Sequence, residues 1–401
     1  MPRHDADLII AGAGCAGLSA LHFALQHESD RRIVVIDRSF EPSDDRTWAF
    51  WGTAQAPFAN LADRRWDHLR VKFPTWSSTQ RLQRPHDPAS THRRTYMRVR
   101  RRNYDAAILC EAESRPNVRF VAQDILAVTD DRGGNGGIVS LPEGELRAPL
   151  VLQSALAPRR PGTTELRHPL RQHFGGWEVV TDRPVFDPDV ATLMDFDTAQ
   201  HDAVSFVYVL PEAPNRALVE HTTLSTEVKD REFHGQCVAD YLYRLGVGEF
   251  DVVRTEYGVI PMEDAPPAQR HGRHVWNVGT VGGGTKPSSG YTFARTHIQT
   301  EHLIRQWADG AALTPPPARP RRFAFADRTL LHILHRQPEL GRPVFERLFR
   351  STSIDDVLTF LDERSSLGAD ARMVAALPQL PFLRAAASEI AADVRSRWSA
   401  R

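Results

Sequence analysis

The feature that most constrains this chain is a glycine turn near its N-terminus. Residues 12–17 read GAGCAG, which fits the pattern GxGxxG. The apolar run Leu8–Ala11 precedes the turn, a helical stretch extends to about His27, and the β-rich run Ile33–Ile36 ends at Asp37. Strand, turn, helix and strand in this order predict the βαβ opening of a doubly wound sheet.

The glycines of this turn suit one kind of ligand. Gly12, Gly14 and Gly17 let the backbone turn tightly, approach a pyrophosphate and pack helix on strand, while the helix N-terminus favours an anion. Asp37 ends the second predicted strand and supplies an acceptor for a ribose hydroxyl. We therefore expect a dinucleotide site; a glycine turn with an unrelated acid is the alternative.

A second glycine cluster, VGTVGGGTK at residues 278–286, follows another predicted strand. Its backbone N–H groups can come close to a ligand. With the first motif at the extreme N-terminus, this layout favours FAD over NAD, and a flexible loop is the alternative. The cofactor-binding positions expected in this cluster are Gly279, Gly282, Gly283, Gly284, Thr285 and Lys286.

Alternating apolar and polar residues mark a different region between Pro169 and Pro261, which predicts an antiparallel sheet inserted into the α/β fold. Residues 133–137 read as a hairpin tip and Ala294–Asp309 as a helix. The expected division is therefore a Rossmann-type FAD-binding domain in two parts, an inserted substrate domain and a C-terminal helical segment beyond a proline-rich linker. The boundaries are 1–168, 169–262, 263–312 and 313–401.

Composition excludes several classes of function. Lys plus Arg equals Asp plus Glu, at 50 each, so nucleic acid is not an expected partner. Three scattered cysteines without CxxC spacing predict neither disulfides nor a metal site, and they favour a cytoplasmic setting. The apolar run Leu8–Leu25 is interrupted by glycines and no other run is long enough to span a bilayer, so any membrane contact is expected to be peripheral.

The residues after the second predicted strand make the interpretation more specific. Asp45–Trp51, DRTWAFW, resembles the RTWxFW signature of the bacterial lycopene β-cyclase family of carotenoid biosynthesis. Further blocks resemble that family in the same order, to about residue 310. They are Gln172–Trp177, Pro184–Asp189, Met194–Phe196, Leu218–Thr222, Gly258–Met262 and Gly282–Phe293.

The resemblance implies an isomerase that converts lycopene to γ-carotene and β-carotene. A proton adds to the terminal double bond, a ring closes through a tertiary cation, and a different proton leaves, so there is no net redox change. Reduced FAD, with NAD(P)H as the expected reductant, is implied as a cofactor, because an anionic ring stabilises a nearby cation where water is excluded.

Leu218–Thr222 occupies the place of the family's glutamate motif, which reads FLEET in plant enzymes, so the resemblance implies that Glu220 is the acid or base. Burial would keep such a carboxyl protonated until use. His221 stands where the plant motif has a second glutamate and is expected to face away from Glu220, because neighbouring strand residues alternate. A solvated strand glutamate is the alternative.

Aromatic residues are expected to protect the cation, at about 0.5 to 2 kcal/mol for each desolvated ring face. The candidates are Trp48, Phe50, Trp51 and Trp177, of which Trp48, Trp51 and Trp177, together with His221, are expected to contact the substrate. Arg46 is expected either to contact the flavin phosphates or to lie on the surface. Gln153 stands where many relatives carry Asp, and its role stays open.

A forty-carbon hydrocarbon must be collected from lipid, so the C-terminal helices are a candidate membrane surface. Their apolar pairs, which core packing explains equally well, are Leu330–Leu331, Ile333–Leu334, Val344–Phe345 and Leu348–Phe349. Two rival functions stay open. One is an FAD-dependent oxidoreductase, such as a hydroxylase or polyprenyl reductase, and the other is a carotenoid- or lipid-binding protein with a vestigial cofactor site.

Overall fold

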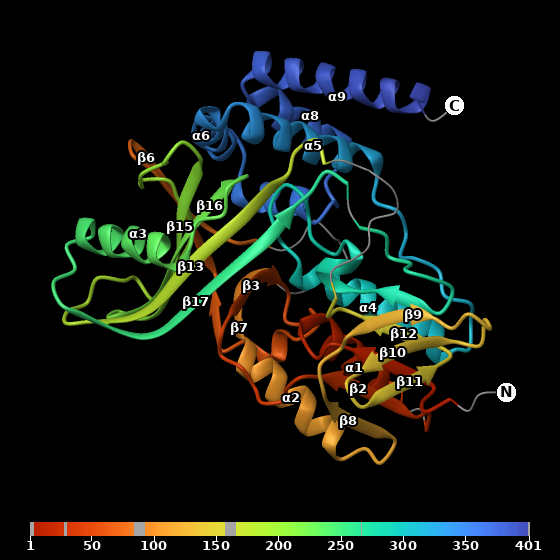
Figure 1. Ribbon diagram of the computed structural model, residues 1–401. Helices are drawn as coiled ribbons and strands as arrows, with labels where there is room; N and C mark the ends of the chain where they lie inside the picture. The colour runs from red at the N-terminus through yellow and green to blue at the C-terminus, as the bar shows by residue number, and fades with distance from the viewer. Residues whose placement is uncertain (1–3, 28–29, 84–92, 157–165, 266, 400–401) are drawn as a thin grey trace.

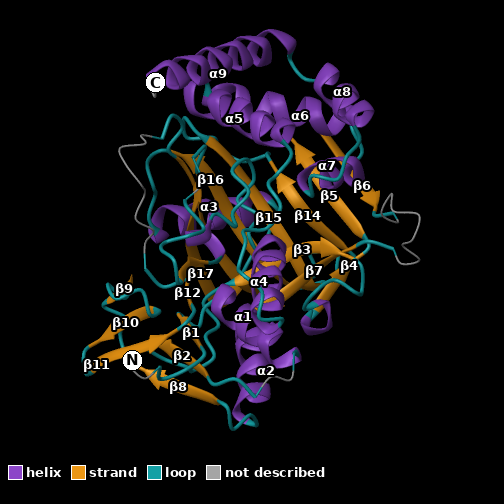
Figure 2. Cartoon of the chain, turned by 90° about the vertical axis from the view of Figure 1, so that its right-hand side faces the viewer, coloured by secondary structure: helices purple, strands orange, loops and turns teal. Residues whose placement is uncertain are grey.

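The computed structural model describes residues 4–27, 30–83, 93–156, 166–265 and 267–399. Figures 1 and 2 show two main sheets, a small parallel one at one end of the molecule and a large twisted one in its middle, with a layer of C-terminal helices at the other end.

The parallel sheet has five strands in the order β18-β12-β1-β2-β8. Its three central strands are buried on both faces, which explains their continuous apolar sequences. Leu8 and Ile10 pack under helices, whereas Ile9 and Ala11 pack against a small antiparallel sheet on the opposite face. The strands are β1 (Leu8–Ala11), β2 (Ile33–Asp37), β8 (Val118–Ala122), β12 (Val151–Gln153) and β18 (Val275–Asn277).

The elements that cover this sheet agree with the sequence. The predicted strand–turn–helix–strand opening is confirmed, and so are the hairpin around residues 133–137 and the helix near 294–309. The helices are α1 (Cys15–Gln26), α2 (Arg101–Glu113) and α4 (Phe293–Ala308). The small antiparallel sheet consists of β9 (Ala127–Asp130), β10 (Gly137–Leu141) and β11 (Gly144–Ala148).

The large sheet has seven strands in the order β17-β13-β16-β15-β14-β5-β6. Its pairs are antiparallel except β14 with β5. The predicted antiparallel sheet is therefore present, and it also recruits two strands from the first 168 residues, while the division into domains stays a prediction. The strands are β5 (His68–Phe73), β6 (Trp76–Arg81), β13 (Leu170–Thr181), β14 (Val190–Asp195), β15 (Val204–Ala213), β16 (Arg216–Ser225) and β17 (Phe250–Met262).

One face of this sheet carries α3 (Arg231–Arg244), which begins where the Asp230 carboxylate accepts a hydrogen bond from the backbone N–H of Phe233 (Figure 1). The other face meets the parallel sheet and a third, three-stranded sheet. That sheet consists of β3 (Thr47–Gly52), β7 (Thr95–Arg100) and β4 (Arg64–Trp66). Short 3₁₀ turns lie at Ala59–Leu61, Gly279–Gly282 and Pro338–Leu340.

Five helices follow the proline-rich linker and cover one end of the large sheet (Figure 2). Leu331, Leu334, Phe345 and Phe349 are buried against strand residues such as Phe206. Of the two alternatives left open for the apolar pairs of residues 330–349, core packing is therefore the one that the structure supports. The helices are α5 (Arg321–Arg336), α6 (Gly341–Ser351), α7 (Ile354–Leu361), α8 (Leu367–Ala376) and α9 (Gln379–Ser399).

Within the described part of the chain, none of the helices combines the length and the apolar character needed to cross a bilayer.

Candidate active site

A cavity of about 370 Å³ lies between the large sheet, on the face opposite α3, and the glycine turn at residues 12–17. The large sheet contributes residues of β13, β15, β16 and β17. The two glycine clusters contribute Gly14, Cys15, Gly279 and Thr280. The two glycine clusters, far apart in sequence, thus meet one cavity, as the sequence predicts for a shared ligand.

The geometry of the first glycine turn fits a pyrophosphate. A Cβ on Gly17 would lie 1.7 Å from the Gly12 carbonyl oxygen, and Gly12 has φ +104°, so neither position tolerates a side chain. Gly14 has no atom within 4 Å of where its Cβ would be. Among the described residues, no side chain caps α1 and no acid lies in its first turn, so its N–H groups are available to an anion.

Asp37 lies at the end of β2, beside this turn. Its carboxylate accepts a hydrogen bond of 2.6 Å from the backbone N–H of Ala13 and so holds the turn in place. Binding of a ribose hydroxyl by Asp37 stays a prediction.

The second glycine cluster forms a compact turn that only partly faces the cavity. Gly279 lines the cavity, has φ +68° and donates its N–H to Gln299 Oε1 at 2.8 Å. Gly282, Gly283, Gly284 and Thr285 are not among the lining residues; Gly282 packs against the backbone of Asn277, and Thr285 Oγ1 lies 3.0 Å from Thr292 Oγ1.

Lys286 points away from the cavity. Its buried Nζ lies 3.0 Å from Asp327 Oδ1 and 3.1 Å from Glu363 Oε1, so it anchors the C-terminal helices. Ser289, which the sequence did not single out, lines the cavity with a buried hydroxyl that has no hydrogen-bond partner among the described residues. An unpartnered hydroxyl in that position fits a polar ligand.

Glu220 lies on β16 and faces the cavity. Burial raises the pKa of its carboxyl well above the usual range, and the charge of Glu256 and a hydrogen bond with it add to this rise. The Thr222 hydroxyl donates to Glu220 Oε1 at 3.2 Å and acts in the opposite direction. Burial and Glu256 both favour the protonated form of the carboxyl, which is the form that a proton donor requires.

Glu256 and Gly176 are site residues that the sequence did not reveal. In the sheet register, Gly176 of β13 lies opposite Glu220 on one side and Glu256 on the other. A Cβ at position 176 would lie 3.1 Å from Glu256 Cγ and 3.2 Å from Glu220 Cβ, so the missing side chain makes room for both. Glu256 lies two residues before Gly258, the first residue of the block Gly258–Met262. Because strand residues two apart face the same side, this spacing could have indicated that Glu256 and Gly258 share one face of the strand.

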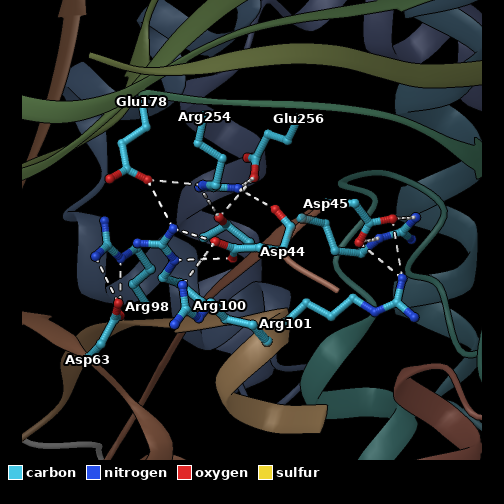
Figure 3. A network of polar contacts seen from close by, with 12 residues as sticks. Asp44, Asp45, Asp63, Arg98, Arg100, Arg101, Glu178, Arg254 and Glu256 are labelled. Carbon is cyan, nitrogen blue, oxygen red and sulfur yellow. Dashed lines mark hydrogen bonds and ion pairs between the residues drawn. The ribbon is translucent and has the colours of Figure 1, made fainter. Parts of the chain in front are cut away.

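Figure 3 shows the charged network around Glu256. Arg254 joins two carboxylates, with Nε 2.9 Å from Glu178 Oε2 and Nη1 2.7 Å from Glu256 Oε2. The Thr47 hydroxyl donates to Glu256 Oε2 at 2.8 Å, and Arg254 Nη2 donates to the Thr47 oxygen at 2.9 Å. Strands β3 and β17 are thereby fixed at one end of the cavity.

The cavity wall is rich in aromatic rings. Trp48 lies in it as predicted and stacks on Phe293 at a centroid distance of 5.2 Å. Tyr208 and Tyr96 each form a hydrogen bond with Tyr291 close to Glu220. The alternation along residues 204–210 could have indicated that Tyr208 faces the cavity. Tyr96 and Tyr291 come from separate segments, so no local pattern pointed to them.

Three predicted substrate residues lie elsewhere. His221 is on the α3 face of the sheet, where its Nδ1 lies 2.9 Å from His234 Nδ1. Trp177 packs on that same face against Gly235 of α3. Trp51 is outside the lining and donates from Nε1 to Asp362 Oδ1 at 2.8 Å. Phe50 is a core residue behind Phe293.

Arg46 lines the cavity beside Gly14 and forms a 3.2 Å ion pair with Asp45. Gln153 is buried at the end of β12, where Nε2 donates to Asn277 Oδ1 at 2.5 Å and Oε1 accepts from the N–H of Leu156 at 3.0 Å. Gln153 therefore ties β12 to β18 and to the following loop.

Known proteins resemble this chain along most of its length. A family model described as "Lycopene cyclase protein" matches residues 7–387. The lycopene beta-cyclase of Paracoccus sp. (strain N81106 / MBIC 01143) is 28% identical over 298 residues, which cover 71% of this chain and 70% of that protein.

Two crystal structures share the fold. A geranylgeranyl bacteriochlorophyll reductase-like protein from Thermoplasma acidophilum has a TM-score of 0.60 at 14% identity and covers 94% of this chain and 98% of its own. A flavoprotein/dehydrogenase from Cytophaga hutchinsonii has a TM-score of 0.59 at 13% identity and covers 89% and 92%. These similarities confirm the predicted fold class, an α/β flavoprotein fold with an antiparallel sheet and C-terminal helices. Because the family model matches nearly the whole chain, this protein belongs to the lycopene cyclase family and is an enzyme of that family.

Proposed function

We propose that the enzyme is a lycopene β-cyclase that closes rings on the ends of an acyclic polyene by acid–base chemistry. The observation that carries the proposal is the placement of Glu220, a buried carboxyl with a raised pKa, in an aromatic-lined cavity that borders both glycine clusters. A protonated carboxyl can protonate an alkene, and the aromatic wall suits an apolar end group and the cation that it forms.

In the proposed reaction, the Glu220 O–H bond breaks and its proton adds to the terminal double bond of the polyene. The resulting cation is attacked by the neighbouring double bond, and the new carbon–carbon bond closes the ring. A proton then leaves the adjacent ring carbon and returns to the Glu220 carboxylate. Atoms and electrons balance, so the acid is restored without an oxidant.

We propose FAD as the cofactor, bound at Gly12, Gly14 and Gly17, with Asp37, Arg46 and Gly279 beside it. The open space at Gly14, the uncapped N-terminus of α1 and the unpartnered Ser289 hydroxyl support this. In its reduced form, with NAD(P)H as the proposed reductant, FAD would supply negative charge close to the cation.

The test is Glu220→Gln, which keeps the shape of the side chain and removes the acid. Turnover of lycopene with reduced FAD under anaerobic conditions should fall by about 10² to 10⁴-fold. Glu227→Gln is the matched control, because Glu227 follows the same strand but pairs with Lys229 outside the cavity at 2.8 Å. Flavin absorbance would verify cofactor loading, and normal turnover in a loaded Glu220→Gln enzyme would refute the proposal.

The rival function is an FAD-dependent oxidoreductase on an apolar isoprenoid, which the shared fold supports as well. The two differ in electron count. A cyclase forms many rings per reduced flavin, whereas an oxidoreductase oxidises one reduced flavin per product when no further reductant is present. Product and flavin absorbance measured together in one anaerobic sample decide between them.

For substrate supply, we propose that α8 and α9 contact an anionic bilayer. Leu367 is 71% exposed, and Leu380, Leu383 and Ile390 are also exposed along α9. The last three follow spacings of three and seven residues and so lie on one helix face. Arg372 and Arg384 are exposed on the same two helices, which adds charge complementarity to anionic headgroups.

Sedimentation with vesicles that contain phosphatidylglycerol tests this contact. The double variant Leu383→Glu/Ile390→Glu should lose vesicle binding, whereas Leu126→Glu, at an equally exposed leucine near β9, should keep it. An unmodified enzyme that stays in the supernatant with these vesicles would disprove the docking proposal without affecting the chemistry.

A further inference from the structure

The carboxyls of Glu220 and Glu256 meet across a strand whose own residue between them is glycine. Both residues line the cavity, and a hydrogen bond joins their carboxyls. Because Gly176 lies opposite both in the register of β16-β13-β17, no side chain separates them. A proton on one of the two carboxyls is favoured, because two negative charges on neighbouring buried groups repel strongly.

The surroundings of the two carboxyls are unequal. Glu256 Oε2 accepts hydrogen bonds from the Arg254 guanidinium at 2.7 Å and from the Thr47 hydroxyl at 2.8 Å, and both favour an ionised carboxylate. Among the described residues, Glu220 accepts only the longer, neutral hydrogen bond from Thr222, at 3.2 Å. The proton is therefore favoured on Glu220 and the charge on Glu256.

The other groups that face Glu220 do not reverse this asymmetry. Tyr96 of β7, Tyr208 of β15 and Tyr291 all lie close to it, and burial raises the pKa of each phenol, so all three are neutral. Arg254 on β17 favours ionisation of Glu220, but its guanidinium is already bound to Glu256 and Glu178.

We propose that Glu256 is a positioning residue for catalysis, the charged partner that keeps the proton on Glu220 before ring closure and draws it back there afterwards. This inference rests on the proposed role of Glu220 as the acid. Glu256 exchanges no proton with the substrate, and its carboxylate stays bound to Arg254 throughout. The proton balance of the reaction is unchanged.

The test is Glu256→Gln, measured as the pH dependence of kcat with reduced FAD. Removal of the neighbouring negative charge should make Glu220 lose its proton at lower pH. The alkaline limb of the profile should therefore move to lower pH by about one unit or more, which a purely structural residue would not cause. Glu256→Asp keeps the charge and should return the limb towards its original position.

The matched control is Glu178→Gln. Glu178 binds the same guanidinium from its other side (Figure 3) but is not among the groups that shift the pKa of Glu220 most strongly. This variant should leave the alkaline limb in place. An unmoved limb in flavin-loaded Glu256→Gln, or an equal shift in Glu178→Gln, would overturn the inference. Normal turnover of Glu220→Gln would instead overturn the proposed function itself, so the two failures are distinguishable.

Discussion

Each face of β16 buries a titratable side chain, but the consequence of burial differs between the two faces. Glu220 faces the cavity and its neighbour His221 faces α3, and burial favours the uncharged form of both side chains. Burial lowers the pKa of His221 to about 3, with help from nearby histidines, whereas it raises that of Glu220. Only the carboxyl borders a cavity, so an uncharged group is open to a ligand on one face and is packed against a helix on the other.

The α3 face carries a hydrogen-bonded chain of histidines. His221 Nδ1 lies 2.9 Å from His234, His234 Nε2 lies 2.9 Å from His173 Nδ1, and His173 Nε2 lies 2.9 Å from Ser225 Oγ. A buried titratable group is thus no sign of function by itself. Glu220 differs from His221 in two ways: it borders a cavity, and a second carboxyl lies beside it.

The two adjacent glycines of β13 give the largest expected contrast between the faces. Gly176→Ala places a Cβ between the two carboxyls and should reduce kcat by about 10- to 100-fold, because the acid loses its position. Gly175→Ala places a Cβ 2.6 Å from His234 Cβ and should instead cost about 1 to 3 kcal/mol of stability. Steady-state kinetics and urea unfolding on both variants would measure this, and equal kinetic losses would break the comparison.

Two tryptophans test the same contrast more weakly. Trp48→Leu removes a ring from the cavity wall and should lower kcat/KM by about 2- to 30-fold, which corresponds to about 0.5 to 2 kcal/mol of cation stabilisation. Trp177→Leu, on the α3 face, should leave kcat/KM of the folded enzyme unchanged while lowering its melting temperature. A larger kinetic loss in Trp177→Leu would show that the α3 face takes part in catalysis.

The smallest expected effect is the pH dependence of stability. In the folded protein, the pKa values of His221, His234 and His173 are about 3, 4 and 4, below the ordinary value of 6.5, chiefly because of burial. The unfolded chain therefore binds protons first as the pH falls, so stability is complete above about 6.5 and is lost towards pH 4.

The melting temperature should therefore drop by several degrees from pH 7 to pH 5, and His234→Gln should flatten this drop. Glu220 acts in the other direction, since its raised pKa costs stability as the pH rises above 4.5. An unchanged slope in His234→Gln would assign the acid sensitivity to another region.

The sequence predicted what depends on neighbouring residues. The opening around Gly12–Gly17 was foreseen because strand, turn and helix are local patterns, and the opposite facing of Glu220 and His221 followed from strand alternation. The same alternation applied to β13 would have placed Trp177 and Gly176 on different faces of the strand. The sequence alone did not indicate which face packs against α3 and which borders the cavity.

What the sequence could not predict depends on pairing between distant segments. Glu256 meets Glu220 only because β13 lies between β16 and β17, an order that no local pattern encodes. Lys286 was expected at the cofactor because it adjoins glycines, yet its partners are Asp327 of α5 and Glu363 in the turn after α7, both beyond the linker. The apolar pairs of α5 and α6 could not be assigned to core or membrane without knowing what covers the sheet.

The buried Lys286 ammonium has a consequence for shortened versions of this enzyme. Its counter-charges, Asp327 and Glu363, both belong to the segment beyond residue 312. A chain cut at the linker would leave the Lys286 ammonium without either of these counter-charges, two residues after Gly284. Removal of the C-terminal segment should therefore loosen the glycine-rich turn at residues 279–284, although that turn lies outside the segment removed.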